Sequence, residues 1–169
     1  LPPFAHTDQE ILCAEKGVHI FVEKPVALTM EKAREIYAAV KKSGIITQVG
    51  YQSRFMRELI TARNILLEEG GRIALFQAIR YGAIAGGPDH WWRRMELSGG
   101  QLVEQSTHQV DLARWFVGDV EEVFAYFEMD LLKNLPNFNV EDVSVVALKF
   151  ANGALGNITS TCASKPGGY

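Results

Sequence analysis

An alternation of helix and strand in the first fifty residues is the feature that most constrains the fold. Residues 18–22 (VHIFV) and 45–49 (IITQV) are short runs rich in β-branched and aromatic residues, as is typical of strands buried in a parallel sheet. Helical patterns precede them at residues 7–16 and 29–43, and each is followed by a glycine. We therefore interpret residues 1–50 as the C-terminal half of a Rossmann-type, doubly wound α/β domain.

The pattern changes after Gly50. A long amphipathic helix is predicted at residues 55–69, a strand at 72–83, and a second helix at 100–117 after a loop. Further strands are predicted at residues 120–129, 140–150 and 154–162, and a turn at 165–168. This order favours an α+β domain with a largely antiparallel open sheet, which we assign to residues 51–169 as an incomplete substrate-binding and dimerisation domain.

Composition excludes several classes of function. The net charge is −3 with both signs interspersed, so a nucleic-acid partner is not expected. The apolar stretches are too short for a membrane-spanning helix and no export signal is visible, so we expect a soluble, cytoplasmic protein. Cys13 and Cys162 are far apart and lack a C-x-x-C spacing, which indicates two ordinary thiols and no metal site.

The first candidate site follows the strand at residues 18–22. Glu23, Lys24 and Pro25 come directly after it, at the edge where open α/β sheets bind their ligands. Pro25 biases Lys24 away from helical backbone, with a cis peptide bond as one way of fixing it, so the lysine side chain is held in one direction. The alternative is an ordinary turn. His19, within the same run, is interpreted as a core histidine.

The second candidate site is the helix predicted at residues 100–117. Glu104 and His108 are four residues apart and would share one face of that helix, with Asp111 a further turn along. A carboxylate beside a histidine can orient the imidazole and suits it to act as a general base near neutral pH. The alternative is a surface pair without a catalytic role.

Together these segments resemble the Gfo/Idh/MocA oxidoreductases, the family of glucose-fructose oxidoreductase and inositol dehydrogenase. The resemblance covers almost the whole chain. It includes a P-x-x-x-H turn at Pro2 to His6, the E-K-P signature at Glu23 to Pro25, and a glycine-rich helix start that leads to an acidic residue and His108. The ordered combination, with Lys24 and Glu104 about eighty residues apart, is far more specific than either motif alone.

The resemblance implies an NAD- or NADP-dependent oxidoreductase that acts on a secondary alcohol of a sugar, sugar derivative or cyclitol. It implies that Lys24 binds the substrate hydroxyl and the nicotinamide ribose, and that His108 accepts the hydroxyl proton as hydride leaves the neighbouring carbon. Glu104 stands where the family usually has aspartate, and is assigned to substrate binding and catalysis with Lys24 and His108. Homo-oligomerisation through the second-domain sheet is also implied.

Further residues are assigned roles by the same resemblance. The segment from Gly50 to Phe55 resembles the family's domain-crossing segment, which makes Gln52 a cofactor candidate and Arg54 a substrate candidate. Core packing is the alternative for Trp92, and helix capping is the alternative for His6. The full set of cofactor-binding candidates is Pro3, His6, Glu23, Lys24, Pro25, Gln52, Trp92 and Arg93.

One family feature is missing from the 169 residues. The dinucleotide fingerprint, G-x-G-x-x-G after a strand, does not occur in them. We therefore expect the sequence to be cut at both ends, and the chain alone to be inactive and prone to self-association. Two alternative functions stay open: an NAD-dependent glycoside hydrolase of the same fold, and a non-catalytic ligand-sensing or dimerisation relative.

Overall fold

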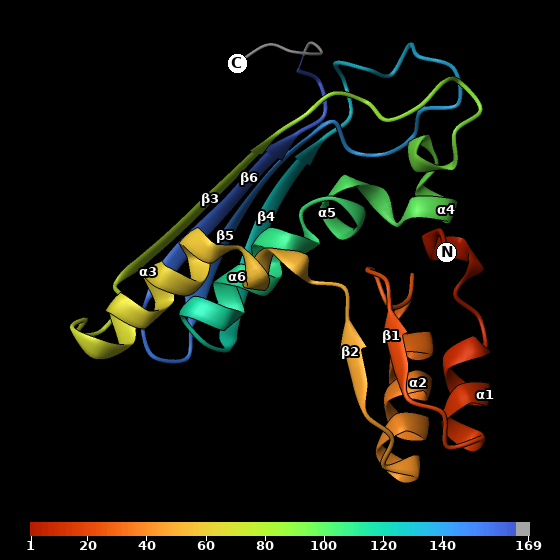
Figure 1. Ribbon diagram of the computed structural model, residues 1–169. Helices are drawn as coiled ribbons and strands as arrows, with labels where there is room; N and C mark the ends of the chain where they lie inside the picture. The colour runs from red at the N-terminus through yellow and green to blue at the C-terminus, as the bar shows by residue number, and fades with distance from the viewer. Residues whose placement is uncertain (165–169) are drawn as a thin grey trace.

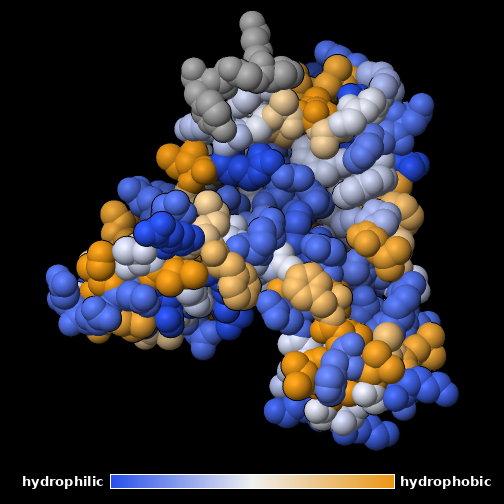
Figure 2. All heavy atoms as spheres, viewed as in Figure 1, coloured by the Kyte–Doolittle hydropathy of each residue, from blue (hydrophilic) through white to orange (hydrophobic). Residues whose placement is uncertain are grey.

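The computed structural model describes residues 1–164, which form a small α/β lobe and a larger lobe built on an open sheet (Figure 1). The turn predicted at residues 165–168 lies outside the described residues. The surface where the two lobes meet is mainly hydrophilic (Figure 2). None of the helices in residues 1–164 combines the length and the apolar character that crossing a membrane would require.

The small lobe has the predicted order of helices and strands. β1 pairs in parallel with β2, with Val22 opposite Val49. The side chain of Thr29 accepts a hydrogen bond from the backbone N–H of Lys32, which confirms the predicted start of the second helix. The elements are η1 (Pro3–Ala5), α1 (Gln9–Glu15), β1 (Ile20–Val22), α2 (Met30–Ser43) and β2 (Thr47–Val49).

The interpretation of His19 as a core histidine is wrong. The strand begins only at Ile20, so His19 lies in the exposed connection before it. Its Nδ1 accepts a hydrogen bond from the backbone N–H of Ile46 at 3.2 Å. The imidazole thus helps join the two strands from the surface.

The larger lobe contains the mostly antiparallel open sheet that the sequence predicts. Its strand order is β3-β6-β5-β4, in which β3 and β6 are parallel and the other neighbours antiparallel. Its helices are η2 (Gln52–Phe55), α3 (Arg57–Glu68), η3 (Trp91–Arg93), α4 (Met95–Ser98), α5 (Gly100–Glu104) and α6 (Thr107–Phe116), and its strands are β3 (Leu75–Tyr81), β4 (Val120–Glu128), β5 (Val143–Phe150) and β6 (Leu155–Thr161).

The core of this lobe lies between the sheet and the helices on one of its faces (Figure 1). Ala113 of α6 packs with Phe150 of β5 and Ile158 of β6, and each of these residues is at most 1% exposed. Because side chains alternate along a strand, the neighbouring residues of β5 and β6 point to the opposite face. The placement of a domain boundary at residue 50 stays a prediction.

The single helix predicted at residues 100–117 is in fact two helices. The backbone N–H groups of Gln105 and Ser106 both donate to the carbonyl of Gln101, and the helical pattern restarts with a bond from Gln109 N–H to the carbonyl of Ser106. Glu104 therefore ends α5, while His108 lies in the first turn of α6. The prediction that these two residues share one face of a continuous helix is wrong.

Candidate active site

Lys24 projects from the carboxyl end of β1 into the junction of the two lobes. The Lys24–Pro25 peptide bond is cis. The Nζ of Lys24 donates to the backbone carbonyl of Glu104 at 2.6 Å and to its Oε1 at 2.8 Å. These contacts join the small lobe to the end of α5. The two residues that the sequence separates by eighty positions are thus direct partners.

The carboxylate of Glu104 is surrounded by donors. Oε1 accepts from Lys24, while Oε2 accepts from the indole N–H of Trp92 at 2.8 Å and from the amide of Gln105. The Glu104 side chain is only 10% exposed. Since both oxygens already have protein partners, the carboxylate is arranged to hold Lys24 in place.

His108 lies beside this pair, half-buried in the first turn of α6. Its ring is nearly perpendicular to that of Tyr51, at an interplanar angle of 86° and with ring centroids 6.2 Å apart. Burial lowers the pKa of His108, and the nearby Lys24 ammonium lowers it further, against the opposing effect of the carboxylates of Asp111, Glu104 and Glu23. A neutral imidazole can accept a proton, so the environment favours the base form at neutral pH.

Arg54 lies at the same junction but faces a protein partner. Its Nε and Nη2 donate to the two carboxylate oxygens of Asp111, at 2.7 and 2.6 Å. Asp111 is buried on α6, whereas the side chain of Arg54 is 38% exposed. The bidentate pair ties η2 to α6 and so braces the segment that carries His108. Arg54 and Asp111 also line a hollow of about 460 Å³, together with Tyr51 and Gln48.

The two remaining candidates, Trp92 and Arg93, lie in η3, within the long loop that connects β3 to α4 (residues 82–94), and bind mainly to other parts of the protein. Trp92 is 2% exposed and packs against Val140 and Cys162. The guanidinium of buried Arg93 donates to the carbonyls of Pro136 and Gly86, at 3.3 and 3.2 Å. Trp92 therefore has the core packing predicted as its alternative role, and the guanidinium of Arg93 joins the segments that contain Gly86 and Pro136.

The cofactor candidates of the small lobe have varied surroundings. Pro3 is buried, and Nδ1 of buried His6 lies 2.8 Å from Oε1 of Glu10. Pro25 is also buried. Glu23 is exposed and lies so close to Gly50 that a Cβ there would be 2.8 Å from its Oε2. Gln52 is exposed at the start of η2.

Arg80 and Gln105 are polar neighbours of the site that the sequence motifs do not reveal. An Nη2–H of Arg80, from β3, donates to Oε1 of Gln105, and Nε2 of Gln105 donates to Oε2 of Glu104. Neither residue belongs to a recognisable motif. Gln105 comes to the site as the C-cap residue of α5, directly after Glu104, and Arg80 comes to it through the pairing of β3 with β6.

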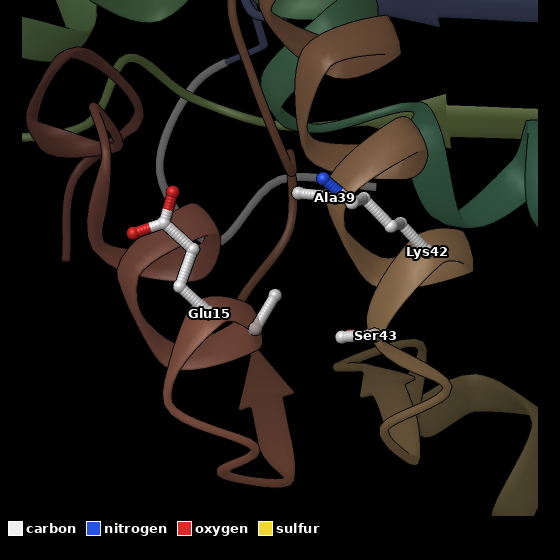
Figure 3. Close-up of a pocket in the computed structure, with 5 residues that line it drawn as sticks. Glu15, Ala39, Lys42 and Ser43 are labelled. Carbon is white, nitrogen blue, oxygen red and sulfur yellow. The ribbon is translucent and has the colours of Figure 1, made fainter.

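Other features of the described residues lie away from this cluster. A hollow of about 410 Å³ lies between α1 and α2, and none of its lining residues is a predicted site residue. They are Ala14, Glu15, Ala39, Lys42 and Ser43, the last four of which Figure 3 labels. Within residues 1–164, no group of three histidine, cysteine or acidic side chains is arranged to hold a metal ion. The candidate active site is therefore the junction of the two lobes, where Lys24, Glu104 and His108 lie close together.

Two family models together match nearly the whole chain. Residues 1–51 match the model described as "Oxidoreductase family, NAD-binding Rossmann fold". Residues 55–168 match the model described as "GFO/IDH/MocA C-terminal domain". The residues that meet around Lys24 come from both matched segments.

Individual proteins of known activity are similar over nearly the same range. Levoglucosan dehydrogenase of Pseudarthrobacter phenanthrenivorans is 30% identical over 95% of this chain, and myo-inositol 2-dehydrogenase of Thermotoga maritima is 29% identical over 92%. A solved levoglucosan dehydrogenase in complex with NADH and levoglucosan has a TM-score of 0.87 at 30% identity, and the match covers 97% of this chain. The chain spans about half the length of these relatives, 47%, 46% and 47% respectively.

Proposed function

Because the chain belongs to the Gfo/Idh/MocA family of oxidoreductases, we propose that it carries the catalytic residues of an NAD- or NADP-dependent enzyme that oxidises a secondary alcohol. The substrate is a sugar, a sugar derivative or a cyclitol. One observation carries this proposal: the Lys24 ammonium is held by Glu104 in the junction where His108 is kept neutral by its surroundings.

Lys24 is the residue that binds the substrate hydroxyl. An ammonium has three N–H donors, and two of those on Lys24 are used by the carbonyl and carboxylate of Glu104. The third is left for an oxygen of the ligand. Glu104 acts on the substrate through Lys24, because its own oxygens accept bonds from Lys24, Trp92 and Gln105.

His108 is the base. When bound, the nicotinamide supplies a hydride acceptor. As the carbinol C–H bond breaks toward that acceptor, the hydroxyl proton passes to the neutral imidazole of His108, and the carbinol becomes a ketone. The ammonium of Lys24 stabilises the negative charge that develops on the oxygen as the proton leaves.

The residues at the carboxyl edge of β1 and β2 fit the nicotinamide end of a dinucleotide. The backbone N–H of Gly50 donates to the carbonyl of Val22 at 2.8 Å, so the two strand ends stay together at the edge where parallel sheets bind such ligands. Glu23, exposed at this edge, offers acceptors for ribose hydroxyls. The assignments do not extend to the pyrophosphate, because the 169 residues contain no G-x-G-x-x-G turn.

The open face of the larger lobe supports homo-oligomerisation as part of the proposal. Paired positions of the four strands present apolar side chains on the face away from the helices. They are Leu75, Ile79, Tyr81, Phe124, Tyr126, Val145 and Leu155, each between 46% and 72% exposed. Exposed apolar side chains gathered on one face of a sheet favour an interaction surface, and a second copy of the same sheet would cover them.

Measured hydride transfer tests the proposed activity. The native full-length protein that carries these residues is assayed for NAD⁺ or NADP⁺ reduction with a panel of sugars, anhydrosugars and cyclitols, and product ketone is identified. Lys24→Ala should lower kcat/KM by a factor of about a hundred or more, since it removes a charge-assisted donor to the reacting oxygen. Lys41→Ala, an exposed lysine of α2, is the matched control.

The alternatives predict other results. Release of a sugar without net reduction of cofactor would identify the glycoside hydrolase, and ligand binding without any turnover would identify the sensor. Full activity of Lys24→Ala would contradict the assigned chemistry, whatever the substrate.

A further inference from the structure

Gln105 occupies a position in which its amide has only one favourable orientation. Its Oε1 faces the guanidinium of Arg80, and its Nε2 faces the carboxylate of Glu104. A guanidinium can only donate hydrogen bonds, and an ionised carboxylate can only accept them. The flipped amide would place donor against donor and acceptor against acceptor. Arg80 and Glu104 together therefore fix the direction of the Gln105 amide.

Arg80 is itself held in place by the sheet. It follows Phe76 and Ala78 on the helix-facing side of β3, where both of those side chains pack against the core. Its guanidinium lies against Gly82, so a Cβ on Gly82 would collide with Nη1 of Arg80. Within residues 1–164 no carboxylate forms an ion pair with Arg80, and its guanidinium donates to the neutral amide of Gln105.

We propose that Arg80 and Gln105 are positioning residues for Lys24: Arg80 orients the Gln105 amide, which fixes Glu104, which in turn holds the Lys24 ammonium toward the substrate hydroxyl. With Oε2 of Glu104 held by Gln105 and Trp92, Oε1 is directed to Lys24 at 2.8 Å. The sheet of the larger lobe thereby sets the direction of a side chain that belongs to the small lobe. The role in catalysis rests on the proposed function, whereas the chain of contacts does not.

The indole N–H of Trp92 reports on this chain of contacts without requiring activity. It donates to the same Oε2 that accepts from Gln105, so its ¹H–¹⁵N resonance depends on where that carboxylate lies. The resonance is assigned in the native full-length protein by its loss in Trp92→Phe. It is then compared in the wild type, Arg80→Met, Gln105→Leu and the double variant, with Arg34→Met of α2 as a control on an exposed arginine.

The expected result is a double-mutant cycle that is not additive. Arg80→Met and Gln105→Leu should each move the Trp92 resonance, and the double variant should coincide with Gln105→Leu. Each single variant should also lower kcat by about three- to tenfold, the loss expected for one hydrogen bond, with NADH affinity unchanged. Arg80→Lys, which keeps a cationic donor, should restore most of the activity and the resonance.

Two outcomes would overturn the proposal. The first is a Trp92 resonance that Arg80→Met leaves unmoved. The second is a shift of the Trp92 resonance caused by Arg80→Met that is as large in the Gln105→Leu background as in the wild type. Arg80 would then act on Glu104 without Gln105. If the wild type shows no hydride transfer, the proposed function fails. The double-mutant cycle on the Trp92 resonance still decides whether Arg80 orients Glu104 through Gln105.

Discussion

Arg54 and Asp111 form a two-bond ion pair that connects η2 to α6 across 57 positions of sequence, with N···O distances of 2.7 and 2.6 Å. Asp111 is buried, and its carboxylate would be left without its cation if Arg54 were removed. The family resemblance predicts that Arg54 binds substrate. Its geometry favours a different role, in which it braces the helix that carries His108.

The first prediction follows from this pair. Asp111→Asn should lower the free energy of unfolding by about 1–3 kcal/mol, because it removes a charged partner of a bidentate bond and leaves the guanidinium with an amide. Arg54→Lys should also destabilise, since an ammonium cannot form the fork. The measurement is the denaturant midpoint. Arg114→Lys tests an exposed ion pair with Asp119 and should change stability by less than about 1 kcal/mol.

The second prediction concerns pH. The pKa of His108 lies below its ordinary value of 6.5 because of burial and the Lys24 ammonium, so the imidazole is neutral at pH 7 and becomes protonated only at lower pH. A protonated His108 cannot accept the hydroxyl proton. The value of kcat/KM should therefore be constant near pH 7 and fall on the acidic side of pH 6.5.

The control for the pH profile is His108→Asn, which should abolish the acidic fall along with most of the activity. His90→Asn changes a histidine of the long loop and should leave the profile intact. An acidic fall centred above pH 6.5 in the wild type would contradict the assignment of His108 as the base.

The site was partly predictable from the sequence, for reasons that individual residues make clear. Lys24 could be placed at the carboxyl edge of the sheet because it follows a parallel strand and precedes a proline. The prediction that this strand and its neighbour are buried is wrong, since Phe21 is 64% exposed and β2 contains no buried residue. The geometry of Glu104 and His108 was not predictable, because the helix between them breaks where two N–H groups share the Gln101 carbonyl. That break has no marker such as proline in the sequence. Arg80 reaches the site through strand pairing, which no local pattern encodes.

The limits of the helices and strands were also less predictable from local sequence than their order. The predicted order of helices and strands is confirmed for most of the chain, but the loop predicted before residue 100 contains η3 and α4, and the helix predicted at residues 100–117 is divided into α5 and α6. The helix predicted from residue 55 begins at Arg57, because the 3₁₀ turn Gln52–Phe55 precedes it. The strand predicted at residues 72–83 is shortened to Leu75–Tyr81, the range over which it pairs with β6.

The third prediction concerns Gly100, at the start of α5. Its φ of 89° lies in the left-handed region, and a Cβ there would collide with Oε2 of Glu141, whose Oε1 accepts from the Leu102 N–H at 2.6 Å. Gly100→Ala should therefore destabilise by about 2 kcal/mol or more, the sum of backbone strain and a displaced buried carboxylate. Gly44→Ala, with φ of 70° and open space, should cost about 1 kcal/mol. Thermal or denaturant unfolding of both variants makes the comparison, and equal losses would refute the collision.

The last prediction concerns the open face of the sheet. Tyr126 is the most exposed of its apolar residues at 72%, and its ring packs edge-on against Phe124 with centroids 5.0 Å apart. A second copy placed on this face would bury both rings, so Tyr126→Glu would place a charge in a desolvated contact and should weaken association by tenfold or more, roughly 1.4 kcal/mol. Sedimentation equilibrium of the native full-length protein measures this shift. Tyr37→Glu, on the exposed side of α2 at 65%, is the matched control. Because the site residues lie on the helix side of the sheet or in the small lobe, Tyr126→Glu should leave NADH affinity unchanged. A wild type that is monomeric at every concentration would contradict the assignment of this face to self-association.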